Sequence, residues 1–207
     1  MGTTQADALA RLWSERGFTI DGHRLDRQRL FGRTAPLVLE IGSGMGDATL
    51  AQAAADPHRD YLAVDVHTPG LGSLLAGAEA RGLTNVRAAR GDALELLADD
   101  IGPGELEAIH IFFPDPWPKA RHHKRRIIQP ERVALMRDRL RAGGVLHTAT
   151  DWADYAEHMA AVLSADPELS GGEVVRPAWR PVTKYERRGV QAGRTIKDLI
   201  FKRRELH

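Results

Sequence analysis

Cysteine is absent from the 207 residues of this chain. This excludes a disulfide framework, a zinc site with thiolate ligands and any reaction through a cysteine nucleophile. Aromatic residues make up only 6% of the chain. No apolar run approaches the roughly 20 residues that a membrane-spanning helix needs. The first residues include Asp7, Arg11 and Glu15 and lack a signal-peptide pattern. We therefore expect a cytoplasmic protein without a membrane segment.

Neither sign of charge is in large excess, since the formal net charge is +1, but the two signs are segregated along the chain. Residues 119–141 hold nine Lys and Arg against two acids, and residues 184–204 hold eight against two. Clustered cations release counterions when they meet a polyanion, so these segments predict a basic face for phosphates. The alternative is that these cations cover solvated helix faces.

Short apolar runs alternate with segments of helical period from residue 37 onward, which is typical of a parallel sheet covered on both faces. The expected strands are Leu37–Ile41, Tyr61–Val64, Val86–Ala89, Leu106–Phe113, Gly144–Ala149, Glu173–Arg176 and Thr195–Lys202. The expected helices are Ala48–Ala55, Leu71–Arg81, Ala93–Ala98, Pro130–Arg141 and Tyr155–Ser164. We predict an α/β, Rossmann-like fold with a mostly parallel central sheet of about seven strands.

The first 35 residues precede this alternating pattern. They are expected to form a helix, Leu9–Arg16, and a loop that reaches the first strand. We interpret residues 1–35 as an extension of the same domain and residues 36–207 as the domain that carries the chemistry.

A glycine turn follows the first expected strand, in the sequence Glu-Ile-Gly-Ser-Gly-Met-Gly-Asp at residues 40–47. At this position doubly wound sheets bind nucleotides, because glycine lets a ligand approach the backbone. The spacing, with Gly42 and Gly44, differs from the G-x-G-x-x-G of pyrophosphate sites. The acid Glu40 would repel a phosphate but suits a cationic amino-acid group. Both features favour S-adenosylmethionine over a nicotinamide dinucleotide.

Acidic residues also follow the next strands. Asp65 is placed to accept from ribose hydroxyls, and Asp92 from an adenine amino group. Taken alone, either aspartate could instead be a helix N-cap. Together with Glu40 and Asp115, they form a set of acids at successive strand ends, which indicates a class I methyltransferase.

The sequence Phe-Phe-Pro-Asp-Pro-Trp-Pro-Lys at residues 112–119 ends the fourth strand in a stiff turn, because proline lacks an N–H and restricts the residue before it. The turn carries Asp115, Trp117 and Lys119. A dense basic run, Arg121–Arg126, follows it. An acid and an aromatic ring beside clustered cations suit an enzyme that acts on a nucleobase within RNA. The adjacent His122 and His123 point apart, so no metal is expected.

These motifs, together with Thr-Asp-Trp at 150–152 and Thr-Lys-Tyr-Glu-Arg-Arg-Gly at 183–189, closely resemble those of the bacterial tRNA (guanine-N7)-methyltransferases. The resemblance runs from about Phe31 to Arg203. It implies transfer of a methyl group from S-adenosylmethionine to a guanosine N7 in the tRNA variable loop, with S-adenosylhomocysteine as product. The implied cofactor residues are Glu40, Gly42, Gly44, Asp65, Asp92 and Asp115. The implied guanosine contacts are Lys119, Asp151, Thr183, Lys184, Tyr185 and Glu186, and the implied RNA contacts are Arg121, His122, His123, Lys124, Arg125 and Arg126.

Three positions depart from the family's pattern. Asp65 stands where Glu is more common, His123 replaces Asn, and Tyr185 replaces Phe. The arginine-rich arm that usually precedes this domain is not evident before Leu9. The oligomeric state stays open between monomer and homodimer.

Guanine N7 carries a lone pair and no proton at neutral pH, so the transfer needs orientation rather than a general base. Carboxylates can accept from guanine N1–H and the 2-amino group, and they stabilise the positive charge that methylation creates. The candidates are Asp115, Asp151 and Glu186, with Asp115 as the predicted catalytic residue. Two alternatives remain: an RNA methyltransferase for an exocyclic amino group, because Pro-Asp-Pro-Trp is close to the turn of those enzymes, and a non-catalytic RNA-binding protein on this scaffold.

Overall fold

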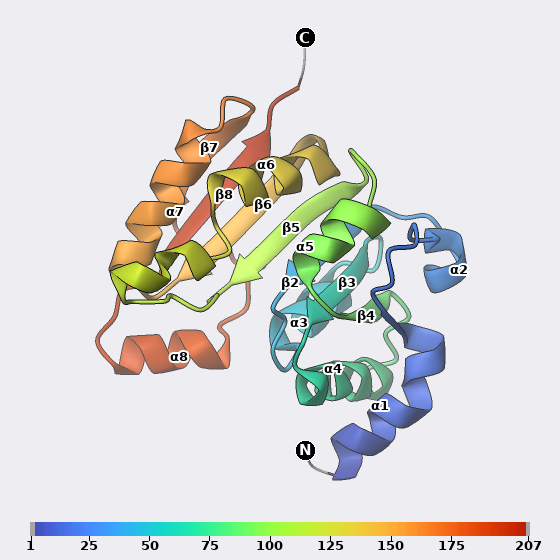
Figure 1. Ribbon diagram of the computed structural model, residues 1–207. Coiled ribbons are helices and arrows are strands. Elements are labelled where there is room, and N and C mark those ends of the chain that lie inside the picture. The colour runs from blue at the N-terminus through green and yellow to red at the C-terminus, as the bar shows by residue number, and fades with distance from the viewer. Residues whose placement is uncertain (1–2, 206–207) are drawn as a thin grey trace.

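One sheet of eight strands runs through the computed structural model, which describes residues 3–205 (Figure 1). The strands are β1 (Gly17–Thr19), β2 (Leu37–Ile41), β3 (Asp60–Asp65), β4 (Val86–Arg90), β5 (Leu106–Phe112), β6 (Leu140–Thr150), β7 (Leu169–Val174) and β8 (Lys197–Arg203). Their order in the sheet is β1-β4-β3-β2-β5-β6-β8-β7. The pairs from β1 to β6 are parallel, whereas β8 runs antiparallel to both β6 and β7.

Helices cover both faces of the sheet (Figure 1). They are α1 (Thr3–Arg16), α2 (Arg27–Phe31), α3 (Asp47–Ala55), α4 (Thr68–Ala80), α5 (Ala93–Glu95), α6 (Pro130–Arg139), α7 (Ala153–Ala165) and α8 (Lys184–Gln191), with a π-helical turn η1 (Leu96–Asp100) and a 3₁₀ helix η2 (Ala120–Arg125). Among residues 3–205, no helix is both long and apolar enough to cross a membrane.

Alternate residues of the central strands enter two separate cores, as the period of a strand requires. Leu39 and Ile109 belong to the core beneath α6 and α7, with Met136 and Tyr155. Their neighbours Val38 and Ala108 belong to the core beneath α1, α3 and α4. Burial on both faces explains why these strands read as short, nearly continuous apolar runs, and it confirms the predicted α/β fold.

The structure corrects the sequence prediction at several places; for example, the short helix α2 lies in the segment expected to be a loop. The prediction of about seven strands misses β1, which pairs with β4 inside the segment expected to be a helix and a loop. The strand expected at Glu173–Arg176 is β7, and it begins at Leu169. The helix α8 was not predicted. The last three differences have a reason in the sequence. The three residues of β1 are too few to show a period, two adjacent glycines in β7 interrupt its strand pattern, and α8 is mostly polar.

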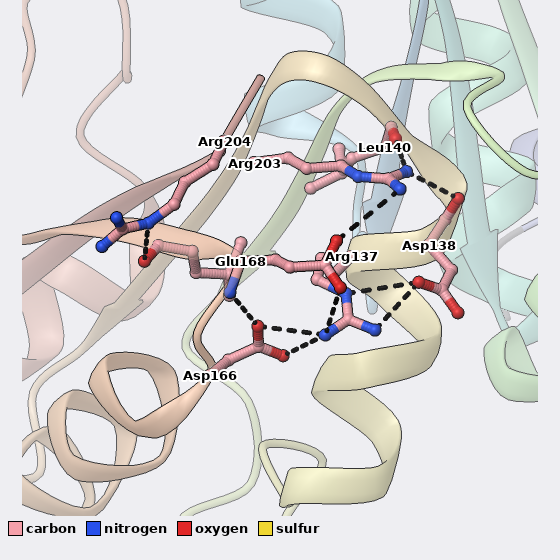
Figure 2. A network of polar contacts seen from close by, with 8 residues as sticks. Arg137, Asp138, Leu140, Asp166, Glu168, Arg203 and Arg204 are labelled. Atoms are coloured by element: carbon pink, nitrogen blue, oxygen red, sulfur yellow. Dashed lines mark hydrogen bonds and ion pairs between the residues drawn. The ribbon is translucent and has the colours of Figure 1, made fainter. Parts of the chain in front are cut away.

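A network centred on Arg137 joins the end of α6 to the connection between α7 and β7, at the amino-terminal ends of the parallel strands (Figure 2). Its guanidinium lies 3.0 Å from the carboxylates of both Asp138 and Asp166. Beside it, Arg203 of β8 donates to the backbone oxygens of Asp138 and Leu140 at 3.1 and 2.6 Å. The amino-terminal ends of the parallel strands, where this network lies, are called the opposite end below. The carboxyl-terminal ends of the parallel strands form the other end of the sheet.

Candidate active site

The glycine turn between β2 and α3 lies at the carboxyl end of the sheet. Gly42, Gly44 and Gly46 all have positive φ, at 73°, 55° and 86°, which glycine adopts without a steric penalty. A Cβ on Gly42 would meet nothing within 4 Å, so this backbone is open to a ligand. On the other side of the turn, a Cβ on Gly70 of α4 would collide with the carbonyl oxygen of Gly44. The turn is therefore packed on one side and accessible on the other.

Two cavities flank this turn, and Gly42 lines both. The larger cavity has a volume of about 450 Å³ and the smaller one about 70 Å³. The larger one is lined by residues that include Gly42, Asp65, Gly91, Asp92, Asp115, Trp117 and Arg125. The smaller one is lined by residues that include Glu40, Gly42, Phe112, Phe113, Thr183, Lys184 and Tyr185. The structure thus brings the predicted strand-end acids together around a single turn.

Glu40 is buried at the end of β2, where its carboxylate accepts a hydrogen bond from the hydroxyl of Thr49. Burial raises the pKa of Glu40 to about 7, and the nearby Asp47 and Asp65 act in the same direction. A cationic group of a ligand would relieve this cost. Glu40 is therefore suited to an ammonium group in the smaller cavity.

Asp65 holds the glycine turn as well as lining the larger cavity. One oxygen accepts from the backbone N–H of Gly44 at 2.9 Å, and the other accepts from that of His67 at 2.8 Å. Two acceptor positions on the carboxylate remain for a ligand, because an ionised carboxylate has about four. Asp65 joins β3 to the turn that follows β2.

Asp92 is the N-cap of α5, since its Oδ1 accepts from the backbone N–H of Leu94 at 2.7 Å. Asp92 therefore caps a helix, as the alternative interpretation of this residue predicted. Asp92 also lines the larger cavity, so a cap and a ligand contact are compatible. Asp115 differs from the other acids: it is exposed, and within residues 3–205 it has no hydrogen-bond partner.

Two strained residues enclose the Pro-Asp-Pro turn. Phe113 has φ 54° and Trp117 has φ 45°, values that bulky side chains rarely adopt. Such backbone costs on the order of 1–3 kcal/mol per residue and persists only where surrounding contacts hold it. The N–H of Phe113 donates to Ala149 O at 2.7 Å, and the guanidinium of Arg125 lies 4.9 Å from the centre of the Trp117 ring. The turn therefore holds Asp115 in a fixed place.

The basic run divides into exposed and buried cations. Lys119, Arg121, Lys124 and Arg125 are exposed. Arg126, in contrast, is buried: it donates to Pro116 O at 2.9 Å and pairs with Asp154. Arg126, which the resemblance implies as an RNA contact, thus has its guanidinium inside the protein, where it bonds to the backbone of the Pro-Asp-Pro turn.

The two histidines of this run are half-buried. His122 meets the edge of the Trp117 ring at 6.0 Å, and His123 Nε2 lies 3.8 Å from an oxygen of Asp154. In the described part of the chain, no group of three or more His, Cys, Asp or Glu side chains lies close enough to hold a metal ion.

The first turn of α8 lies close to the glycine turn. Thr183 is the N-cap and accepts from the backbone N–H of Glu186 at 3.2 Å. Lys184 and Tyr185 are exposed, and the ring of Tyr185 lies 3.6 Å from the place of a Cβ on Gly44. In Figure 1, α8 lies beyond the arrowhead of β5.

Two of the predicted guanosine acceptors are already paired. Glu186 is buried, with Oε2 2.6 Å from Arg180 Nη1. Asp151 lies 2.7 Å from Arg194 Nη1. Glu186, which the resemblance implies as a guanosine contact, therefore has its carboxylate turned into the protein in this structure. Asp115 is the unpaired acid among the three candidates.

Comparison with known proteins agrees with this geometry. Residues 34–199 match the family described as "Putative methyltransferase". The chain is 53% identical over 204 residues to a tRNA (guanine-N(7)-)-methyltransferase of Streptomyces avermitilis, covering 96% of this chain and 70% of that protein. It is 48% identical over 208 residues to one of Nitrosospira multiformis, covering 99% and 91%.

The chain belongs to the tRNA (guanine-N7)-methyltransferase family. A likeness to the crystal structure of the 16S rRNA methyltransferase KamB, at 18% identity and a TM-score of 0.64 over 86% of this chain and 92% of that one, shows the fold alone.

Three residues of this tRNA (guanine-N7)-methyltransferase family member escaped the sequence interpretation: Arg180, Asp198 and His147, all buried behind the first turn of α8. The one available signal was that Arg180 stands three residues before the Thr-Lys-Tyr-Glu motif. A charged side chain in a polar segment is ordinarily taken as exposed, so the sequence does not indicate its burial.

Proposed function

We propose that this chain transfers a methyl group from S-adenosylmethionine to N7 of a guanosine in the variable loop of tRNA. The observation that carries the proposal is the position of Asp115. This unpaired carboxylate lines the larger cavity and stands at the head of a run of exposed cations. The family membership supports the same reaction.

The residues at the glycine turn fit S-adenosylmethionine. A cavity of about 450 Å³ is within the range of small-molecule sites, and the open backbone at Gly42 permits close approach. Asp65 is suited to the ribose hydroxyls, Asp92 to the adenine amino group, and Glu40 to the ammonium of the methionine part. Bound S-adenosylmethionine supplies an electrophilic methyl group on a sulfonium.

Asp115 has two roles in this proposal. It accepts a hydrogen bond from the guanine N1–H or 2-amino group, which fixes N7 in line with the methyl group. It also stabilises the positive charge that the base gains. No proton leaves N7, so none of the surrounding residues needs to act as a base there. Adenine lacks the same donors and is disfavoured.

The exposed cations suit the tRNA backbone. Lys119, Arg121, Lys124 and Arg125 follow the turn directly. On α8, exposed Lys184, Arg187 and Arg188 stand on the other side of the smaller cavity. Cations on both sides of the site would hold phosphates on either side of the target nucleotide.

The proposal is tested by incubating tRNA that lacks the modification with methyl-labelled S-adenosylmethionine, followed by nucleoside analysis. We expect label in 7-methylguanosine with the wild-type chain and almost none with Asp115→Asn. Label in an adenine or cytosine amino group would replace the proposal with the exocyclic alternative. Cofactor binding without any label in RNA would favour the non-catalytic alternative.

A further inference from the structure

Arg180 lies at the centre of a buried network behind α8. Its Nε and Nη2 donate to the two oxygens of Asp198 at 2.6 and 2.7 Å, and its Nη1 donates to Glu186 Oε2 at 2.6 Å. His147 Nε2 lies 2.7 Å from the same Asp198 Oδ1. The side chain of Arg180 is completely buried. A bidentate Arg–carboxylate pair fixes both partners in direction as well as distance.

The members of this network come from separate elements. His147 is on β6 and Asp198 on β8, on strands paired in the sheet, whereas Glu186 is in the first turn of α8. Arg180 joins the sheet to the helix. Its guanidinium also lies 5.7 Å and 5.8 Å from the ring centres of Phe112 and Phe113, the residues that lead into the Pro-Asp-Pro turn.

The packing of α8 shows why this connection matters. Within the helix, only Glu186 and Gly189 are buried. Its apolar residues Tyr185 and Val190 are 52% and 59% exposed. A helix is ordinarily held by an apolar face, and α8 has almost none. Its attachment therefore depends on polar contacts, of which the Arg180–Glu186 pair is the most deeply buried.

The charges of the network favour a fixed arrangement. Burial alone would raise the pKa of Asp198, but hydrogen bonds from His147 and Arg180 more than offset this and lower it. Burial lowers the pKa of His147, although its hydrogen bond to Asp198 acts in the other direction. Asp198 and Glu186 both pair with Arg180, and the more exposed Arg176 lies 3.5 Å from the other oxygen of Glu186. Moving α8 away would separate Glu186 from the buried guanidinium and leave Arg180 Nη1 without its carboxylate partner, while the pair with Asp198 stays in place.

We propose that Arg180 is a positioning residue for methyl transfer: through Glu186 it holds the first turn of α8, with Lys184 and Tyr185, over the glycine turn. This inference rests on the proposed function, because α8 carries residues assigned there to the substrate. Asp198 and His147 fix the direction of the Arg180 side chain. Glu186 acts by holding the helix.

The test compares Arg180→Met with Arg180→Lys and with a matched control, Arg137→Met, in the full chain. Arg137 also pairs with carboxylates, those of Asp138, Asp166 and Glu168, but lies at the opposite end. Hydrogen exchange of the amides of residues 184–191 should rise at least about tenfold in Arg180→Met, while exchange in the central strands changes little. Arg180→Lys retains the charge and should recover part of the protection. Arg137→Met should leave exchange in α8 unchanged.

Single-turnover methylation at saturating tRNA and cofactor supplies the second measurement. Arg180→Met should lower this rate by about 10²-fold, since a displacement of about 1 Å in a positioning group has that effect. Arg137→Met should lower the melting temperature while the folded protein keeps its normal rate. If Arg180→Met behaves like Arg137→Met, with normal exchange in α8 and a normal rate, Arg180 is only a structural residue.

A double-mutant cycle separates positioning from direct contact. Glu186→Gln should lower the rate in the wild-type background but have almost no further effect when combined with Arg180→Met. An equal loss in both backgrounds would show that Glu186 acts on the guanosine independently of Arg180, which would overturn the proposed route. The exchange measurement needs no substrate, so it tests the position of α8 even if the wild-type chain fails to methylate tRNA.

Discussion

Two arginine-centred networks, one at each end of the sheet, show how the same chemical groups can serve different purposes. Arg137 pairs with three carboxylates, those of Asp138, Asp166 and Glu168, and Arg180 pairs with two, those of Asp198 and Glu186. The side chain of Arg137 is 15% exposed and those of its partners Asp138 and Asp166 are 48% and 9% exposed, whereas the Arg180 side chain is 0% exposed. The first network joins α6 to the connection between α7 and β7 within the scaffold (Figure 2). The second joins the sheet to a helix that has almost no apolar contact of its own. The arginine at the end of the sheet that carries the candidate active site is thus more deeply buried than the arginine at the opposite end.

The largest effect should come from replacing one acid at each end of the sheet with its amide and comparing the two variants. Asp115→Asn removes charge from an exposed, unpaired carboxylate, so turnover should fall by about 10²-fold or more while the melting temperature barely changes. Asp166→Asn, at the opposite end, weakens an ion pair with Arg137 and should show the reverse pattern. Single-turnover methylation and thermal unfolding of both variants test this. A near-normal rate for Asp115→Asn would remove Asp115 from the catalytic machinery.

The second prediction separates the role of Asp92 in cofactor binding from its role in capping α5. Asn caps helices about as well as Asp, so Asp92→Asn should preserve α5 and the melting temperature. Its side-chain amide can instead present a donor to the adenine amino group. The lost charge-assisted bond should weaken S-adenosylmethionine binding by roughly 1.5–3 kcal/mol, about 10-fold or more. Titration calorimetry measures the affinity of both proteins for S-adenosylmethionine. Unchanged affinity would leave Asp92 with the capping role alone.

Glu40 gives a pH-dependent test with a smaller expected effect. Its pKa in the folded chain is about 7, above the ordinary value of 4.5, so the folded chain binds the extra proton. The stability it contributes is full below about pH 4.5 and is lost as pH rises through 7. Affinity for a cationic cofactor should change in the other direction and rise by about fivefold between pH 6 and 7, because the carboxylate form is needed and its fraction grows from about a tenth to about a half.

Glu40→Gln should abolish both trends, as measured by thermal unfolding and cofactor titration between pH 5 and 8. Asp60→Asn is the matched comparison, because Asp60 is a buried acid at the opposite end that is paired with Arg33. This variant should keep the pH trend of cofactor affinity. If wild-type affinity is flat across this range, Glu40 does not meet the ammonium group.

The smallest effects should come from single cations. Replacing Lys119, Arg121, Lys124 or Arg125 with Gln should each weaken tRNA binding and reduce the slope of log affinity against log salt by up to about one. Arg204→Gln, an exposed cation near the opposite end, should leave the slope unchanged. Filter binding over a salt series measures this. Equal slopes in all variants would mean that the RNA lies on another face.

The central strands and the acids at their ends could be predicted from the sequence because both depend on local patterns. Buried parallel strands produce apolar runs, and the carboxyl ends of parallel strands share one edge of the sheet. For this reason the pattern alone places Glu40, Asp65 and Asp92 near one another. The Pro-Asp-Pro turn was equally visible, because proline restricts the backbone wherever it stands.

The remaining features depend on partners distant in sequence. Arg126 is buried because Asp154 lies 28 residues further along, and Arg180 because Asp198 on β8 faces it. Nothing in either residue's immediate neighbours distinguishes it from an exposed arginine. The helix α8 was missed for a related reason, since it is held by buried charge rather than by an apolar stripe.

The two aromatic residues with positive φ, Phe113 and Trp117, have a consequence for when the Asp115 turn becomes ordered. A flexible loop would lose conformational entropy each time it closed on a substrate, and each catalytic cycle would repeat that loss. Here the contacts of both aromatic residues and two prolines restrict the backbone on either side of Asp115 already in the absence of ligand. The ordering of this turn is therefore completed once, during folding, and the carboxylate meets every successive guanosine in the same position.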